Sequence, residues 1–425
     1  MLRVLGLLIF LYQFAISAAD VSMEIVKNAG YKPSVAVVSS TDAANMQSKF
    51  AGEVHKLLEK DLEVSGHFNV KSVSAQHNFN SNINYYEFKK LNIDLVANIT
   101  TEQSVFEGFI LKLKLYDTNL NQLVLEKSFN SAKDDRYPFL AHRVAIEINN
   151  YVKAPSIDWM ERFVIFSRYT TPKESQIVIA DYTLTFQKVV VQSGLNIFPK
   201  WADNVQENFY YTTYNFGVPT LMKVNIFTAQ SQKIAQSDGM LVCSDVSNDG
   251  KKLLVTMAPN SQPDIYEYNT ISKNFTKITD YSGIDVNGHY LEDERSIVFV
   301  SDRLGNPNIF TQKIGDRGAS RLVYHGKNNN SANTFGNFVV YTSREGDNAF
   351  GKNNFNLYLV STQSSFIKKL TTSGMNQFPK FSKDGESIVF IKTENERSYV
   401  GIIRLNHDKS FLFPLSKGSI QSIDW

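Results

Sequence analysis

Several features that would indicate particular classes of protein are scarce or missing in this chain of 425 residues. Cys243 is the only cysteine, so no intrachain disulfide can form. The 44 basic residues nearly balance the 42 acidic residues and form no basic block, so we expect no nucleic-acid partner. After residue 19, no apolar run approaches the length of a transmembrane helix, and we expect no direct membrane insertion of the mature chain.

Common catalytic and metal-binding motifs are also missing. The sequence has no G-x-S-x-G, no H-E-x-x-H, no phosphate-binding glycine loop and no C-x-x-C. None of the seven histidines pairs with another at ligand spacing. We expect His142 to be a surface or core residue, and His289 to lie in a loop that could line a channel. The sequence therefore predicts no enzyme, no cofactor and no metal site.

The first 19 residues have the pattern of a secretory signal peptide. Arg3 supplies the short basic region, Val4–Ile16 is the apolar stretch, and Ser17–Ala19 offers small residues for cleavage. The mature chain is therefore expected to be exported.

A repeat of about 44 residues runs through the last 260 residues or so. Pro219, Pro263 and Pro307 stand 44 residues apart, each before a short apolar strand. The same spacing relates six apolar anchors, at intervals of 45, 44, 44, 42 and 49 residues: Phe166, Tyr211, Val255, Phe299, Tyr341 and Phe390. Several short strands per repeat of 40 to 50 residues are typical of propeller blades, so the sequence predicts a six-bladed β-propeller over residues 156–425.

Two details of the predicted propeller follow from the repeat. An insertion at residues 344–354 lengthens one hairpin of the fifth blade, which explains the interval of 49. The C-terminal Trp425 matches Trp201 and Phe381, which belong to innermost strands. We therefore expect Gln421–Trp425 to supply the innermost strand of blade one and close the ring, since an open propeller would leave strand edges unpaired.

Residues 34–154 lack the repeat and predict an α/β sandwich. Strands are expected at Ser34–Ser39, Phe68–Val73, Ile93–Ile99, Phe109–Leu115 and Leu123–Phe129. Helices are expected at Met46–Val64, Tyr85–Leu91 and Arg136–Val152. Ala154–Ser156 is the predicted boundary, so the chain has two domains: an N-terminal α/β sandwich and a C-terminal six-bladed β-propeller.

Both domains resemble the TolB family, periplasmic propeller proteins of the Tol–Pal system of Gram-negative bacteria. Asp61–Asn69 is similar to the family's D-L-x-x-S-G-x-F stretch, and Leu91–Leu95 to its L-G-I-D segment. Phe378–Gly385 is close to F-P-x-W-S-P-D-G, although a full S-P-D-G turn is absent. The resemblance implies a monomeric periplasmic adaptor that links the lipoprotein Pal to TolA, maintains the outer membrane and draws it inward at division.

By the same resemblance, residues 20–33 bind the C-terminal domain of TolA. Val21, Met23 and Ile25 alternate with other residues, as in a strand that adds to a partner's sheet. The sequence alone is equally compatible with an ordinary first strand of the N-terminal sheet. The expected TolA-binding residues are Asp20, Val21, Ser22, Met23, Glu24, Ile25, Val26 and Lys27.

Pal is expected to bind where loops from outer to inner strands gather at one end of the propeller channel. Asparagines and an aspartate would form a polar rim, and larger side chains would supply apolar anchors. The resemblance places Met240, Val286 and Asn287 among the family's Pal contacts. The full expected set is Asn196, Phe198, Met240, Asp285, Val286, Asn287, Asn333, Asn376 and Phe378.

Two alternative functions stay open from the residues. A secreted propeller enzyme would need paired channel carboxylates, for which only Asp285 and Glu292 are candidates. A carbohydrate-binding propeller would need tryptophans repeated along the channel, and the chain has only three.

Overall fold

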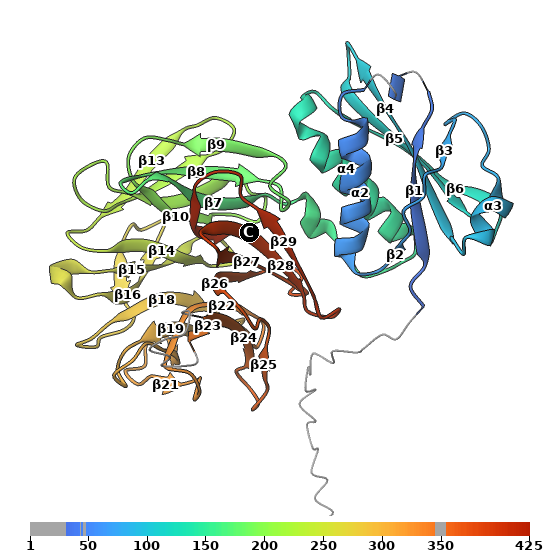
Figure 1. Ribbon diagram of the computed structural model, residues 1–425. Coiled ribbons are helices and arrows are strands. Elements are labelled where there is room, and N and C mark those ends of the chain that lie inside the picture. Colours follow the sequence, from blue (N-terminus) through green and yellow to red (C-terminus); the bar gives the residue numbers. More distant parts are fainter. Residues whose placement is uncertain (1–30, 43, 46–47, 345–353) are drawn as a thin grey trace, which may run out of the picture.

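The computed structural model describes residues 31–425 except for residues 43, 46–47 and 345–353. The predicted signal peptide, the predicted TolA-binding residues and most of the insertion at 344–354 lie outside the described residues. The described chain forms two domains side by side, an α/β domain and a propeller, which confirms the predicted fold class (Figure 1).

The N-terminal domain is built on one mixed sheet in the order β2-β1-β4-β5-β6, with β3 also paired to β1. β1 runs parallel to β4, whereas β4, β5 and β6 are antiparallel. The strands are β1 (Ser34–Ser40), β2 (Asn69–Val70), β3 (Gln76–His77), β4 (Leu95–Ser104), β5 (Gly108–Asp117) and β6 (Gln122–Ser131). The predicted strand Phe68–Val73 is much shorter in the structure, because its pairing with β1 covers only two residues.

Helices cover both faces of this sheet. α2 (Ala51–Ser65) and α4 (Tyr137–Tyr151) pack on the face that carries Val35 and Val37, and α3 (Tyr85–Lys90) lies on the opposite face with Ala36 and Val38. α2 begins five residues later than predicted, and Gly66 ends it in the left-handed conformation that glycine adopts readily. Short 3-10 helices lie at η1 (Asp134–Arg136), η2 (Asp158–Glu161) and η3 (Pro259–Ser261).

The propeller has six blades of four antiparallel strands. Blade one contains β30 (Ser419–Asp424), β7 (Val164–Thr171), β8 (Glu174–Ala180) and β9 (Gln187–Val191). Blade two contains β10 (Asn196–Trp201), β11 (Asn208–Thr213), β12 (Thr220–Asn225) and β13 (Ser231–Gln236). Blade three contains β14 (Leu241–Val246), β15 (Lys252–Met257), β16 (Asp264–Asn269) and β17 (Phe275–Lys277).

The remaining blades follow the same order. Blade four contains β18 (Asp285–Tyr290), β19 (Ser296–Ser301), β20 (Asn308–Lys313) and β21 (Ser320–Arg321). Blade five contains β22 (Asn328–Phe335), β23 (Phe338–Arg344), β24 (Phe355–Ser361) and β25 (Ile367–Lys369). Blade six contains β26 (Met375–Phe381), β27 (Ser387–Glu394), β28 (Arg397–Arg404) and β29 (Lys409–Pro414).

The predicted repeat has a direct structural cause. All six anchors lie in the second strands of their blades, and each opposes a residue of the third strand. Tyr211 faces Met222, and Phe299 faces Phe310. These side chains are buried in clusters that join neighbouring blades. The period of the sequence is therefore the period of this packing.

The C-terminal strand closes the ring as predicted. β30 pairs with β7 in blade one, with Asp424 opposite Ile165 and Ile423 opposite Phe166. Trp425 follows directly and packs edge to face on Trp159, with 5.3 Å between ring centroids. The first and last blades are thereby joined by hydrogen bonds rather than left as open edges.

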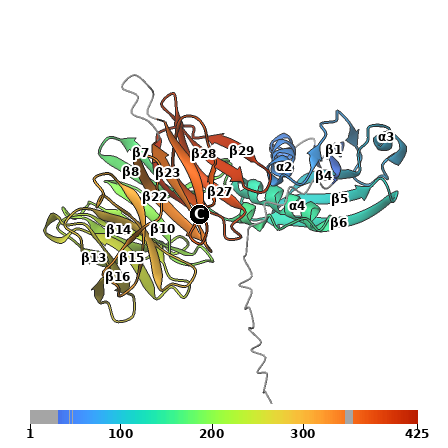
Figure 2. The ribbon, with the colours of Figure 1, turned by 90° about the horizontal axis from the view of Figure 1, so that it is seen from below.

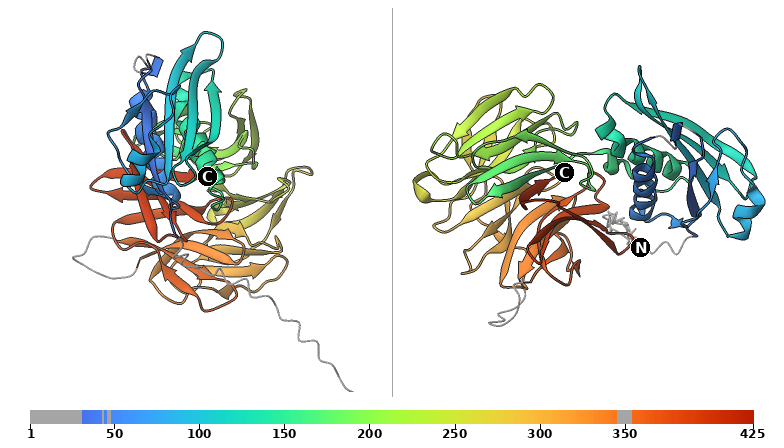
Figure 3. Two further views of the ribbon diagram at one scale, coloured as in Figure 1. Left: turned by 90° about the vertical axis from the view of Figure 1, so that its right-hand side faces the viewer. Right: turned by 45° about the horizontal axis from the view of Figure 1, so that its top comes forward.

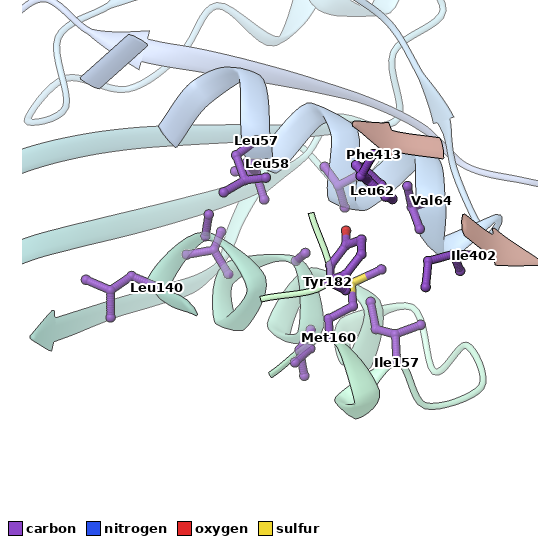
Figure 4. Packing of buried hydrophobic residues seen from close by; sticks show 14 of the residues in the cluster. Leu57, Leu58, Leu62, Val64, Leu140, Ile157, Met160, Tyr182, Ile402 and Phe413 are labelled. Carbon is purple, nitrogen blue, oxygen red and sulfur yellow. The ribbon is translucent and has the colours of Figure 1, made fainter. Parts of the chain in front are cut away.

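The two domains share one continuous hydrophobic core. α2 and α4 lie on the propeller side of the N-terminal domain, near β28 and β29 (Figures 1 and 2). The right-hand view of Figure 3 shows the two domains side by side from another angle. Leu58 and Leu62 of α2 belong to the same buried cluster as Tyr182, Ile402 and Phe413 of the propeller (Figure 4).

A buried polar network crosses the same interface. His142 Nδ1 lies 2.8 Å from Asp61 Oδ2, and His142 Nε2 lies 3.4 Å from Asp181 Oδ2. The Tyr182 hydroxyl also donates to Asp61. Burial opposes a charge on His142, but Asp61 and Asp181 outweigh it and raise the pKa of the imidazole to about 10. His142 is thus a core residue, and its protonated imidazole is stabilised by the carboxylates of Asp61 and Asp181.

Candidate functional site

The innermost strand of every blade has a bulge at the same position, where it lines the channel. In four blades a residue of the bulge has a left-handed backbone, with φ between 50° and 56°: Phe198, Asn287, Ser331 and Phe378. A left-handed residue other than glycine costs about 1–3 kcal/mol and tends to occur at functional sites. Neighbouring blades hold two of these bulges, because the Phe198 N–H donates to Ser422 Oγ and the Asn287 N–H to Thr256 Oγ1, both at 3.1 Å.

Five predicted Pal-binding residues, three of them in these bulges, line one cavity of about 260 Å³. We call it the mouth pocket; its walls include Phe198, Met240, Val242, Val286, Asn287, Ser331, Phe378 and Ile423. Met240 lies just before β14 and is 43% exposed. The mouth pocket is thus a largely apolar hollow with an exposed apolar side chain at its edge.

The other four predicted residues do not form the expected polar rim. Asn196, Asp285, Asn333 and Asn376 are all buried. Asn196 donates through Nδ2 to the carbonyls of Ser175 and Ser193, at 3.1 and 3.0 Å. Rim placement is wrong for these residues because the inner strands begin earlier than expected. The side chains of Asn196, Asp285 and Asn376 therefore lie inside the blades, and that of Asn333 lies deeper in the channel.

The same burial explains what the other three residues do. Asn376 repeats the role of Asn196 in blade six, donating to the Ser373 and Phe355 carbonyls at 2.9 Å. Asp285 accepts both of its hydrogen bonds from the Arg303 guanidinium, at 2.9 and 3.0 Å. Asn333 Oδ1 accepts from the Phe381 N–H at 2.9 Å and so binds the next blade. Asparagine here closes turns and joins blades.

Below the mouth pocket, six side chains surround the channel at one level. Each belongs to the innermost strand of its blade. There it pairs with the residue of the second strand that immediately precedes the apolar anchor of that blade. We call this set the channel ring; it consists of Lys200, Asp245, His289, Asn333, Lys380 and Asp424. The charges of this ring were not predicted from the sequence, although the repeated N-x-F-P-K pattern at Lys200 and Lys380 carries the signal. His289 lies in strand β18, not in the loop that we expected.

The ring is held together by charge and by hydrogen bonds to the next blade. Lys200 Nζ lies 3.3 Å from Asp424 Oδ1 and 3.4 Å from Asp245 Oδ1. The carboxylates also accept backbone N–H groups, Asp424 from Trp201 at 2.9 Å and Asp245 from Tyr290 at 3.0 Å.

The electrostatics of the ring follow from these contacts. Burial opposes the charge on Lys200, but Asp424 and Asp245 outweigh it and raise the pKa of its amine. Burial likewise opposes the charge on Asp245, but Lys200 lowers the pKa of that carboxyl well below its usual range. Burial and the charge of Lys380 lower the pKa of His289 to about 4, so the imidazole is neutral at pH 7.

The opposite end of the channel has a different character. A second cavity of about 370 Å³ lies there, with Lys200 and Lys380 shared between the two cavities. Its lining includes Asp245, Glu292 and Glu294. Charged residues are depleted at the centres of protein interfaces, so the mouth pocket is the better candidate for a protein partner.

The features needed by the alternative functions do not converge. Asp285 pairs with Arg303 inside its blade, whereas Glu292 lines the far cavity. None of the three tryptophans lines the mouth pocket, and Trp159 and Trp201 are buried in the core.

The residues that the structure describes contain no candidate metal cluster and no candidate membrane-spanning helix. Within them, no cluster of three or more histidine, cysteine or acidic side chains could hold a metal ion. None of their helices has the length and apolar character required to span a bilayer.

Comparison with known families assigns both halves of the chain. The model of the TolB amino-terminal domain matches residues 21–124, and that of the TolB beta propeller domain matches residues 161–425. Together these matches cover most of the sequence; the first contains β1 to β5 and the start of β6, and the second contains all six blades.

Individual relatives agree along the whole length. The Tol-Pal system protein TolB of Wolinella succinogenes is 49% identical over 410 residues, covering 96% of each chain. The protein of the same name from Helicobacter hepaticus is 44% identical over 426 residues and covers both chains completely. The crystal structure of TolB from Acinetobacter baumannii has a TM-score of 0.76 at 22% identity and covers 93% of this chain and 97% of that one, which supports the fold.

Proposed function

Because the chain belongs to the TolB family of Tol-Pal system proteins, we propose that it is a non-enzymatic periplasmic adaptor of that system. In this proposal the protein links the lipoprotein Pal to the C-terminal domain of TolA, keeps the outer membrane intact and draws it inward at division. The secretory pattern of residues 1–19 supports export to the periplasm. The adaptor works as a monomer.

The mouth pocket is the observation that supports a Pal site most strongly. Binding energy at protein interfaces concentrates in a few well-packed anchors around a hollow that excludes water. Met240, Phe198 and Phe378 offer such apolar area, and Asn287 adds directional hydrogen bonds at the same opening. Hydrogen bonds to neighbouring blades fix the bulges at Phe198 and Asn287 before a partner binds. Because these two parts of the pocket wall are already ordered, the entropy cost of binding is lower.

The TolA site is proposed to lie at residues 20–33, far along the chain from the mouth pocket. Asp20–Lys27 carries alternating apolar residues, a pattern that suits addition of a strand to a partner's sheet. Separate sites on separate segments are what an adaptor requires.

The experiment measures both interactions with one pair of proteins. The mature protein and a variant without residues 20–28 are titrated with purified Pal and with the TolA C-terminal domain. We expect the mature protein to bind both, and the variant to bind Pal with normal affinity but not TolA. Loss of both interactions in a folded variant, or capture of neither partner by the mature protein, would contradict the proposal.

A further inference from the structure

Within the channel ring, the blades alternate between an acceptor and a nitrogen base. Asp424, Asp245 and Asn333 are the acceptors, and each binds the backbone N–H of the following blade. The bases between them are Lys200, His289 and Lys380. Two acceptors carry a negative charge, but Asn333 is neutral, so Lys380 has a carboxylate, Asp424, on one side only, and Asp424 is ion-paired with Lys200.

Lys380 is consequently left without a counterion. Lys200 Nζ is within 3.4 Å of both ring aspartates. Among the described residues, no carboxylate oxygen lies within the 4.0 Å limit of an ion pair from Lys380 Nζ, and its amine makes no hydrogen bond. Burial and the charge of Lys200 lower the pKa of the Lys380 amine to about 8. An anion that reached this amine would stabilise its positive charge, which burial and Lys200 disfavour.

The surroundings of Lys380 define what kind of anion could reach it. Lys380 is in contact with both cavities of the channel, so it lies at the floor of the mouth pocket. The walls above it carry Phe198, Met240, Val286 and Phe378. A small hydrated anion would leave these walls uncovered, whereas an acid with an apolar body would cover them and place its charge on the amine.

We propose that the mouth pocket binds a carboxylate attached to an apolar group, which enters from the open end and pairs with Lys380. The head group lies against the Lys380 amine at the floor of the pocket, where no carboxylate forms an ion pair with this lysine. The apolar part lies against Met240 and the two phenylalanines. Such a carboxylate could be a free organic acid, or an acidic side chain presented by the protein partner; only the second source rests on the proposed function.

The first arm of the test uses a defined probe. The mature protein is titrated by calorimetry with hexanoate and with hexanamide, which has the same body without the charge. We expect saturable binding of hexanoate but not of hexanamide, and weaker binding as the pH rises through about 8, because the amine loses its proton. Lys380→Met should bind hexanoate at least tenfold more weakly. Lys392→Met, which removes a lysine paired with Glu394 in the same blade, should bind normally.

Stability separates a lost site from a lost fold. Lys380→Met removes a charge without a counterion, so its melting temperature should be unchanged or higher. If wild type binds hexanoate, an equal affinity of Lys380→Met for hexanoate, or an equal affinity of wild type for the amide, would overturn the proposal.

The second arm distinguishes the sources of the carboxylate. If hexanoate does not bind wild type, the affinity of Pal for Lys380→Met decides: a tenfold loss assigns the carboxylate to the partner, and a normal affinity overturns the proposal. Normal binding of Pal to Lys380→Met together with weak binding to Met240→Glu would leave the adaptor function standing without the carboxylate site. If hexanoate binds and Pal does not need Lys380, the ligand is a free acid.

Discussion

Removal of residues 419–425 should abolish a large part of the propeller's free energy of unfolding. The deletion removes the whole ladder between β30 and β7, which covers five residue pairs. Ile420 and Ile423 are 7% and 2% exposed, and burial of each contributes about 1.5–3 kcal/mol. With about one ladder hydrogen bond per pair at about 1 kcal/mol each, the loss is about 8–11 kcal/mol, against a total stability of about 5–15 kcal/mol for a typical domain. Lys200 would also lose Asp424, one of the two aspartates with which it forms an ion pair.

Calorimetric melting is the assay, and two point variants calibrate it. Ile423→Ala removes a buried side chain of the closing strand and should cost about 2–5 kcal/mol. Leu412→Ala on β29 removes an aliphatic side chain that is 39% exposed, and should change little. A deletion variant whose propeller melts at the wild-type temperature would refute the closure argument. Equal effects of the two point variants would show that β30 contributes no more than an exposed strand.

Two further predictions concern buried polar groups. His142→Ala should lower the free energy of unfolding by about 3–5 kcal/mol, because it leaves Asp61 and Asp181 without their shared cation. The folded pKa of His142, about 10, exceeds the unfolded value of about 6.5, so this stabilisation is complete below pH 6.5 and is lost as pH rises towards 10. Denaturant titrations of wild type that show no such decline, or a decline retained in His142→Ala, would contradict this. Asn376→Ala should cost about 1–3 kcal/mol by leaving two carbonyls unpaired, whereas Asn248→Ala in an exposed turn should be silent in the same titration.

Much of the fold could be predicted because a repeat appears directly in the sequence. The anchors Tyr211 and Phe299 recur because each blade buries the same cross-strand pair, so spacing alone gives the number of blades. Closure was visible because Trp425 matches Trp201. Boundaries were less certain: α2 and β2 both differ from expectation, since helix starts and short pairings depend on tertiary contacts.

The site was only partly predictable, for two physical reasons. Asparagine at a strand end serves equally well as a surface ligand or as a buried cap, and burial alone decides between them; Asn196 and Asn376 are caps. The channel ring depends on six residues that are distant in sequence and meet only when the blades close. Lys200 and Lys380 occupy matching motifs, but nothing local shows that one has aspartate partners and the other has none.

Binding of Pal at the mouth pocket is tested most directly by the affinity of Pal for Met240→Glu. A glutamate there would place an unpaired charge in a desolvated contact, at a cost of about 2–5 kcal/mol, which corresponds to a Kd at least ~30-fold weaker. Ile271→Glu is the matched control, since Ile271 is 70% exposed and lies in the β16–β17 turn at the other end of the same blade. The account predicts weak binding for Met240→Glu and normal binding for Ile271→Glu, with both proteins melting as wild type. Normal binding by Met240→Glu, or loss only in Ile271→Glu, would contradict it.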